Sequence, residues 1–148
     1  MNWINIFGLI IVVLMLLPNI LYAYLKKPAE NQCKNKAMNA LEQIGRYGSM
    51  FLMVFNIGIF EFGFYSNKAF AVWLICTVAL LLFYWLYWFL YFSDPKITSA
   101  MLLAIIPSLI FVSSGFFLRH WLLVIFGAIF SVGHIYVTYQ NNSMKDTK

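Results

Sequence analysis

Residues Ala69 to Phe92 read AFAVWLICTVALLLFYWLYWFLYF, an apolar run without a single charged side chain. A helix rises 1.5 Å per residue, so about 20 such residues cross the roughly 30 Å hydrocarbon core of a bilayer. The whole chain has this character, because 63% of its 148 residues are hydrophobic and only 10% are charged, against about 25% charged in a soluble domain. The solvent for this surface is therefore lipid, and the backbone must satisfy its polar groups within helices.

Further apolar runs flank this one, and each is long enough to cross a membrane. The predicted spans are residues 3–25, 44–65, 69–92, 97–118 and 121–139, with residues 26–43 as a cytoplasmic loop. The links between the later spans are short, and short links make sequential helices antiparallel neighbours. The predicted fold class is therefore all-α, an integral membrane up-and-down bundle of about five transmembrane helices, with residues 1–148 forming a single membrane domain.

Two local signals refine these boundaries. Ser93-Asp94-Pro95 is typical of a turn in which Asp94 caps the following helix and Pro95 takes its first position, where a missing N–H costs little. Residues 32–41 have apolar side chains at the spacing of a short interfacial helix within the loop.

The basic residues predict the orientation, because Lys and Arg in short loops are held on the cytoplasmic side. One side of the predicted topology carries Lys26, Lys27, Lys34, Lys36, Arg46, Lys96, Lys145 and Lys148. The other side carries only Lys68 and Arg119. We therefore expect a multi-pass protein of the cell membrane with its N-terminus outside and its C-terminus in the cytoplasm. The formal net charge of +5 forms no basic face, which argues against a nucleic acid partner.

The last span contains the most specific pattern in the sequence. Gly127, Ser131, His134 and Thr138 recur at intervals of four, three and four, which places them on one face of a helix. Small residues permit close helix packing, and His134 would then project into the bundle, where a neutral imidazole can bind a ligand or pass a proton. The alternative is a histidine that only hydrogen-bonds to a helix backbone or to a Ser or Tyr hydroxyl.

Other polar residues within the predicted spans also suggest a site, because polar groups in hydrocarbon are costly. Asn19, next to the helix-kinking Pro18, lies at a depth similar to that of Asn56 and His134, so these three could form a pocket in the inner half of the bundle. They could equally be hydrogen-bonding links between helices. Glu61, the acidic residue within a predicted span, is either a proton or cation site in the outer half or a side chain that reaches the interface.

The candidate ligand-binding residues are thus Asn19, Asn56, Glu61, Ser131 and His134. Glu42 and Arg46 are four residues apart, which suits an ion pair that anchors the second span rather than a site. No catalytic signature occurs, and Cys33, Cys76 and the two histidines form no spaced metal motif. We expect no catalytic residue, no metal and no cofactor.

Three functional hypotheses follow. The first is binding or transport of a small molecule or lipid through the inner pocket. The second is a structural or regulatory subunit of a larger membrane complex, with a membrane-protein partner or a second copy bound through small-residue helix faces and the basic loop. An intramembrane enzyme is third. The expected partners are the lipid bilayer in every case and a hydrophobic small-molecule ligand in the first.

Three short runs carry a resemblance: Leu17 to Ala23, LPNILYA; Leu41 to Gly48, LEQIGRYG; and His134-Ile135. They resemble a group of small, uncharacterised multi-span membrane proteins of low-GC Gram-positive bacteria, which implies a cell-membrane location and adds no activity. In size, span count and orientation the chain is also similar to the tryptophan-rich sensory (translocator) protein family, whose five-helix bundles bind porphyrins and other hydrophobic ligands. The Trp-x-Pro-Pro loop motif of that family is missing, so this similarity implies architecture alone.

Overall fold

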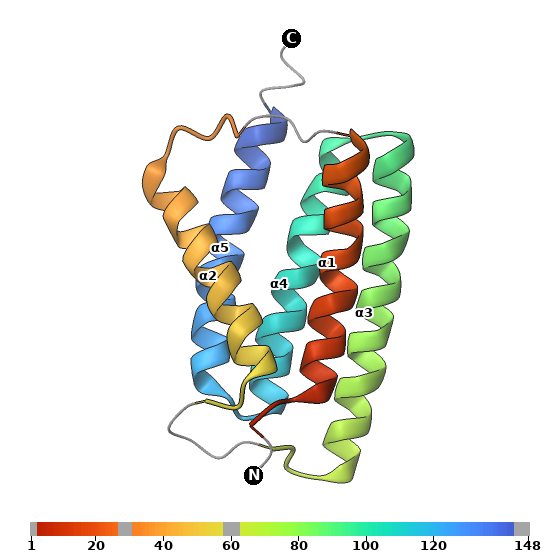
Figure 1. Cartoon of the computed structure of the whole chain (residues 1–148), viewed down its shortest axis with the longest axis vertical. Coiled ribbons are helices and arrows are strands. Elements are labelled where there is room, and N and C mark those ends of the chain that lie inside the picture. The colour runs from red at the N-terminus through yellow and green to blue at the C-terminus, as the bar shows by residue number, and fades with distance from the viewer. Residues whose placement is uncertain (1–2, 27–30, 58–62, 144–148) are drawn as a thin grey trace.

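The computed structural model describes residues 3–26, 31–57 and 63–143, and within them the chain is all-helical apart from one isolated antiparallel bridge between Ile4 and Phe55. The helices are α1 (Ile6–Lys26), α2 (Lys36–Val54), α3 (Asn67–Ser93), α4 (Ile97–Phe117) and α5 (Trp121–Ser143), shown in Figure 1. Four of them, α1, α3, α4 and α5, are long and apolar enough to cross a membrane. The all-α prediction is therefore confirmed.

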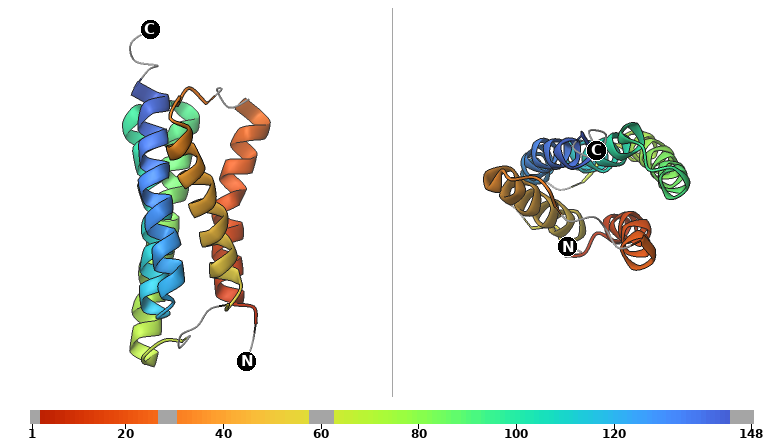
Figure 2. Two further views of the ribbon diagram at one scale, coloured as in Figure 1. Left: turned by 90° about the vertical axis from the view of Figure 1, so that its left-hand side faces the viewer. Right: turned by 90° about the horizontal axis from the view of Figure 1, so that it is seen from above.

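The helices form two rows. Seen along the bundle, α5, α4 and α3 lie in one row, and α2 and α1 lie beside it in the other (Figure 2). The most extensive packing joins α2 to α5 and α4 to α5, whereas α1 and α2 contact each other little. These two helices meet at one end of the bundle and diverge toward the other (Figure 1).

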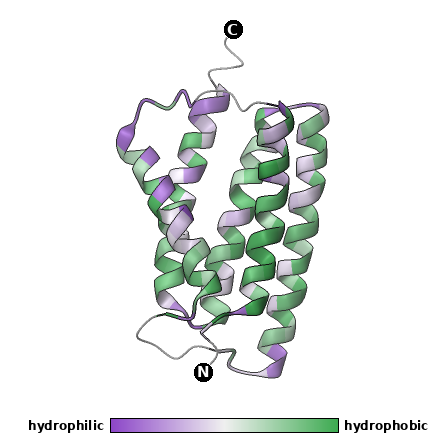
Figure 3. Ribbon diagram, in the orientation of Figure 1, coloured by the Kyte–Doolittle hydropathy of each residue, from purple (hydrophilic) through white to green (hydrophobic). Residues whose placement is uncertain are grey.

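The helices differ in how apolar and hydrophilic residues are distributed along them. Apolar residues cover most of α1, α3 and α4, and hydrophilic residues gather at the ends of the bundle and along the N-terminal half of α2 (Figure 3). Consistent with this, α2 is absent from the helices that meet the length and apolarity needed to span a bilayer. The polar half of α2 lies against α5, which positions charged side chains inside the bundle.

The predicted boundaries of the second helix were wrong. The prediction gave residues 44–65, with at most a short helix at 32–41, whereas α2 is one continuous helix from Lys36 to Val54. Asn35 starts it, because its side chain accepts hydrogen bonds from the backbone N–H groups of Ala37 and Met38. It ends where the N-terminal segment pairs with the chain: the N–H of Asn5 donates to the carbonyl of Val54 at 2.8 Å.

The turn before α4 lies where it was predicted, but the predicted cap was wrong. The helix begins at Ile97, its N-cap is Lys96, and no side chain caps it. Asp94 is instead the C-cap of α3, and its carboxylate accepts from the Lys96 ammonium at 2.7 Å. Because Asp94 pairs with Lys96, its side chain turns toward that charge and not toward the free N–H groups of α4.

The link between α4 and α5 is a tight C-terminal motif. Arg119 has a φ of 55°, and the N–H groups of Arg119 and His120 donate back to the carbonyls of Phe116 and Gly115 at 3.1 and 2.8 Å. Nδ1 of His120 then accepts from the N–H of Leu123 at 3.1 Å. One histidine thus closes α4 and caps α5.

Pro18 lies inside α1 and leaves the carbonyl of Leu14 without its usual helical donor. The indole N–H of Trp85 in α3 donates to that carbonyl at 3.1 Å. The kink is therefore satisfied from the neighbouring helix, and the contact fixes α1 against α3 beside Asn19.

Candidate functional site

All five helices contribute to one cavity of about 130 Å³. It is lined by Met15, Leu16 and Asn19 of α1, Arg46 and Met50 of α2, Tyr84 of α3, Pro107 and Phe111 of α4, and Phe130 and His134 of α5. Most of this wall is apolar or aromatic, and its polar groups come from Asn19, Arg46, Tyr84 and His134. Such a composition is typical of small-molecule sites.

Burial distinguishes the floor of the cavity from its mouth. Tyr84 and Phe111, from α3 and α4, are each only 2% exposed. Asn19 of α1 is exposed, and the side chain of Arg46 of α2 is 34% exposed. These accessible residues belong to α1 and α2, the two helices that diverge (Figure 2).

Glu42, behind the cavity wall, links two of its lining residues, Arg46 and His134. Glu42, only 5% exposed, uses the same oxygen, Oε1, to bind the guanidinium of Arg46 and Nδ1 of His134, the latter at 2.8 Å. An ionised carboxylate can only accept hydrogen bonds, so Nδ1 of His134 is the donor. In the neutral imidazole Nε2 is then the acceptor.

Two glycines explain how a polar segment of α2 comes so close to α5. A Cβ on Gly133 would collide with the backbone of Glu42, and a Cβ on Gly45 would collide with the backbone of Phe130. The two helix backbones are therefore in direct contact at this crossing. The ring of Phe130 stacks on the imidazole of His134, with centroids 4.7 Å apart and planes 17° apart, which fixes its orientation.

On α1, Asn19 organises another part of the cavity wall. Its Nδ2 donates to the carbonyl of Met15 at 2.7 Å and to the hydroxyl of Tyr84 at 2.6 Å. The Tyr84 hydroxyl in turn lies 3.4 Å from the same carbonyl. Both protons of Nδ2 are thereby engaged, and the side chain of Asn19 offers Oδ1 as an acceptor.

Of the five predicted ligand-binding residues, the structure brings Asn19 and His134 to this cavity. Ser131 does not face it: its hydroxyl donates to the carbonyl of Gly127 at 2.7 Å, and the residue borders an outer groove with Met101 and Tyr139. Glu61 lies outside the described residues.

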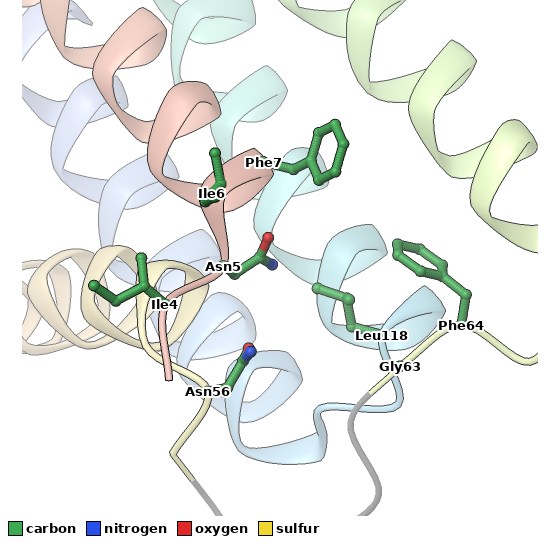
Figure 4. A pocket seen from close by; sticks show the side chains of 8 residues that line it. All are labelled: Ile4, Asn5, Ile6, Phe7, Asn56, Gly63, Phe64 and Leu118. Atoms are coloured by element: carbon green, nitrogen blue, oxygen red, sulfur yellow. The ribbon is translucent and has the colours of Figure 1, made fainter. Parts of the chain in front are cut away.

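Asn56 lies at the other end of the bundle, beyond the last turn of α2. With Asn5, Phe64 and Leu118 it lines a second cavity of about 270 Å³, in which the two amide side chains face the space below Phe7 (Figure 4). The side chain of Asn5 already caps α1 by accepting from the N–H of Gly8 at 3.1 Å. The expected grouping of Asn56 with Asn19 and His134 was therefore wrong, because the second helix ends before Asn56.

Sequence reasoning missed three residues of the site, Glu42, Arg46 and Tyr84. The spacing of Glu42 and Arg46 predicted their ion pair, and the structure confirms it. His134, which completes the cluster with Glu42 and Arg46, lies on α5. Its imidazole binds the Glu42 carboxylate and not a backbone or hydroxyl group. The glycines at 45 and 133 were the available signal, since small residues mark close helix crossings.

Within the part of the chain that the structure describes, no cluster of His, Cys, Asp or Glu could hold a metal ion. Comparison of the chain with protein-family models, with curated proteins and with solved structures gave no match.

Proposed function

We propose that this chain is a five-span membrane protein that binds one small amphipathic molecule in the cavity between its helices. The observation that carries the proposal is the cavity itself, which every helix lines and which combines apolar side chains with four polar ones. Polar residues at membrane depth are costly unless they serve packing or a ligand.

The directions of the helices support five crossings of the membrane. Because α1 and α3 run the same way along the bundle (Figure 1), α2 between them must return the chain through the same depth. Five crossings follow if α1 and α3 are spans. Lys26, Lys34, Lys36 and Lys96 belong to the end where α5 finishes, and the positive-inside rule makes that end cytoplasmic.

The size of the cavity supports an amphipathic ligand. Sites for drug-sized molecules occupy about 300–1,000 Å³, whereas an engineered cavity of about 150 Å³ accepts benzene. A space of about 130 Å³ therefore takes one end of a ligand. The remainder would lie at the mouth, against Leu16 and Met50, and continue into the lipid between α1 and α2.

Cysteine labelling tests this function directly. Thiols react with maleimides as thiolates, which requires water. In a chain carrying Cys33→Ser and Cys76→Ala, reconstituted in lipid nanodiscs, Leu16→Cys places a thiol at the mouth. Leu17→Cys, at a neighbouring position 46% exposed on the outer surface, is the matched control.

We expect Leu16→Cys to react faster than Leu17→Cys. We also expect at least one of dodecanol, dodecanoate, dodecyl phosphate and dodecylamine to slow its labelling saturably. Protection by none of these amphiphiles, or equal protection at both positions, would remove the support for a ligand site.

A further inference from the structure

The cavity wall has a single full charge among the residues that the structure describes there, the guanidinium of Arg46. Glu42, its counter-ion, does not line the cavity and is buried behind the wall, with its side chain 6% exposed. A ligand inside therefore meets a cation at closest range. A cationic head group would be repelled by Arg46, and an anionic one attracted.

The geometry leaves the guanidinium with donors to spare. Glu42 engages one terminal nitrogen of Arg46 through one oxygen, whereas a guanidinium carries five N–H donors in a planar fork. That ion pair joins residues one helical turn apart and holds the fork in place. The remaining N–H groups suit the oxygens of a carboxylate or phosphate, which are planar or tetrahedral acceptors.

The other polar groups at the cavity complement such a head group. His134 contributes Nε2, which accepts from a protonated acid oxygen when the ring is neutral and donates to an anion when the ring is charged. Both amide protons of Asn19 are engaged by Met15 and Tyr84. Asn19 therefore orders the wall and leaves the anionic oxygens to Arg46.

We infer that the ligand is a single-chain amphiphile with an oxyanion head group, a carboxylate or a phosphate, bound by the Arg46 guanidinium that Glu42 holds at the cavity wall. This inference rests on the proposed function, since it names the chemical class of the molecule in the same cavity. The small volume admits the head group and the first part of the chain, which meets the apolar side chains that line the same cavity.

The labelling assay with Leu16→Cys at pH 8 tests the inference with six probes: dodecanoate, dodecyl phosphate, dodecanol, dodecylamine, acetate and inorganic phosphate. We expect at least one of the two long-chain anions to protect at a concentration about tenfold below that of dodecanol, as a charge-assisted contact would give. Dodecylamine should protect less than dodecanol. Acetate and inorganic phosphate, which have no chain, should not protect.

Substitutions at Arg46 test whether this residue causes the preference for long-chain anions. Arg46→Gln should abolish the roughly tenfold preference while dodecanol still protects, which shows that the cavity remains. Arg46→Lys, which retains the charge and loses the planar fork of N–H donors, should keep only part of the preference. Lys96→Gln removes the same charge from an exposed side chain outside the cavity and should change nothing.

The outcomes separate the two proposals. Dodecanol or dodecylamine protecting as well as both long-chain anions would overturn the oxyanion inference and leave the ligand site standing, as would an unchanged preference in Arg46→Gln. Equal protection by acetate or inorganic phosphate would overturn the inference that the ligand needs an alkyl chain. Protection by no probe would remove the proposed function and the inference together.

Discussion

Nδ1 of His134 donates to Oε1 of Glu42 across 2.8 Å and thereby joins α5 to the polar half of α2. The same carboxylate oxygen binds Arg46, so a single buried acceptor serves two donors from different helices. Removal of the acceptor and removal of one donor therefore have different consequences.

Glu42→Ala should destabilise the bundle more than His134→Ala. The first substitution leaves the Arg46 charge without its counter-ion, which costs about 3–5 kcal/mol for a fully buried pair and about 2–3 kcal/mol here, because solvent screens a side chain that is one-third exposed. The second removes one hydrogen bond and one stacked ring, about 1–2 kcal/mol. Unfolding in detergent, followed by circular dichroism, measures both. Equal losses would mean that Glu42 does not hold Arg46.

Gly133→Ala tests the contact between helix backbones that brings Glu42 to His134. The new methyl group would meet the backbone of Glu42, which cannot move without displacing α2. We expect a loss of about 3 kcal/mol or more in the free energy of unfolding, at the upper end of overpacking costs. Gly48→Ala is the control, because the atoms nearest its methyl group would belong to the ring of Phe126. A side chain can rotate away, so we expect about 1–2 kcal/mol there, and the reverse order would contradict this account of the crossing.

Trp85→Phe should cost about 1 kcal/mol, the typical value of one hydrogen bond between membrane helices. The reason is that the indole satisfies the Leu14 carbonyl freed by Pro18. In a Pro18→Ala background, the restored N–H of residue 18 can bond to that carbonyl itself. The cost of Trp85→Phe should therefore shrink, and a double-mutant cycle measures the difference. A coupling energy of zero would show that the indole bond is independent of the kink.

The sequence predicted helices α1, α3, α4 and α5 well because each is an apolar run bounded by polar or turn residues. The predicted bounds of the second helix were displaced because hydropathy carries no information on backbone hydrogen bonds to other segments of the chain. Residues 44–65 are apolar throughout much of their length, yet the chain leaves the helix at Phe55, where Asn5 and Trp3 bond to the neighbouring residues.

The displaced helix also explains the errors at the site. With residues 26–43 assigned to a loop, Glu42 lay outside the predicted bundle, so its contact with His134 could not be anticipated. Asn19 and His134 were identified because any polar side chain within an apolar run requires a partner. Their actual partners, Tyr84 and Glu42, are 65 and 92 residues away in the chain, a separation that no local pattern spans.

His120, in the link between α4 and α5, gives the bundle a pH dependence. Burial lowers the pKa of His120 below its ordinary value of 6.5, and this outweighs backbone hydrogen bonds at His120 and Ile57 that favour the proton. Its Nδ1 accepts from the N–H of Leu123, which a protonated ring could not do. As the pH falls through about 6.5, the unfolded chain binds the proton before the folded one does. The free energy of unfolding must therefore decrease.

His120→Asn isolates this contribution, because asparagine is also a good N-cap and does not titrate. His134 remains in both proteins, so the difference between their profiles belongs to His120. We expect the wild-type protein to lose stability between pH 7.5 and about pH 5.5 more steeply than His120→Asn, measured by thermal unfolding in detergent. The two proteins should converge in slope above pH 7.5, where the histidine is neutral in both states. Parallel profiles across the whole range would show that His120 keeps its ordinary affinity for protons, and that the cap on α5 tolerates the charge.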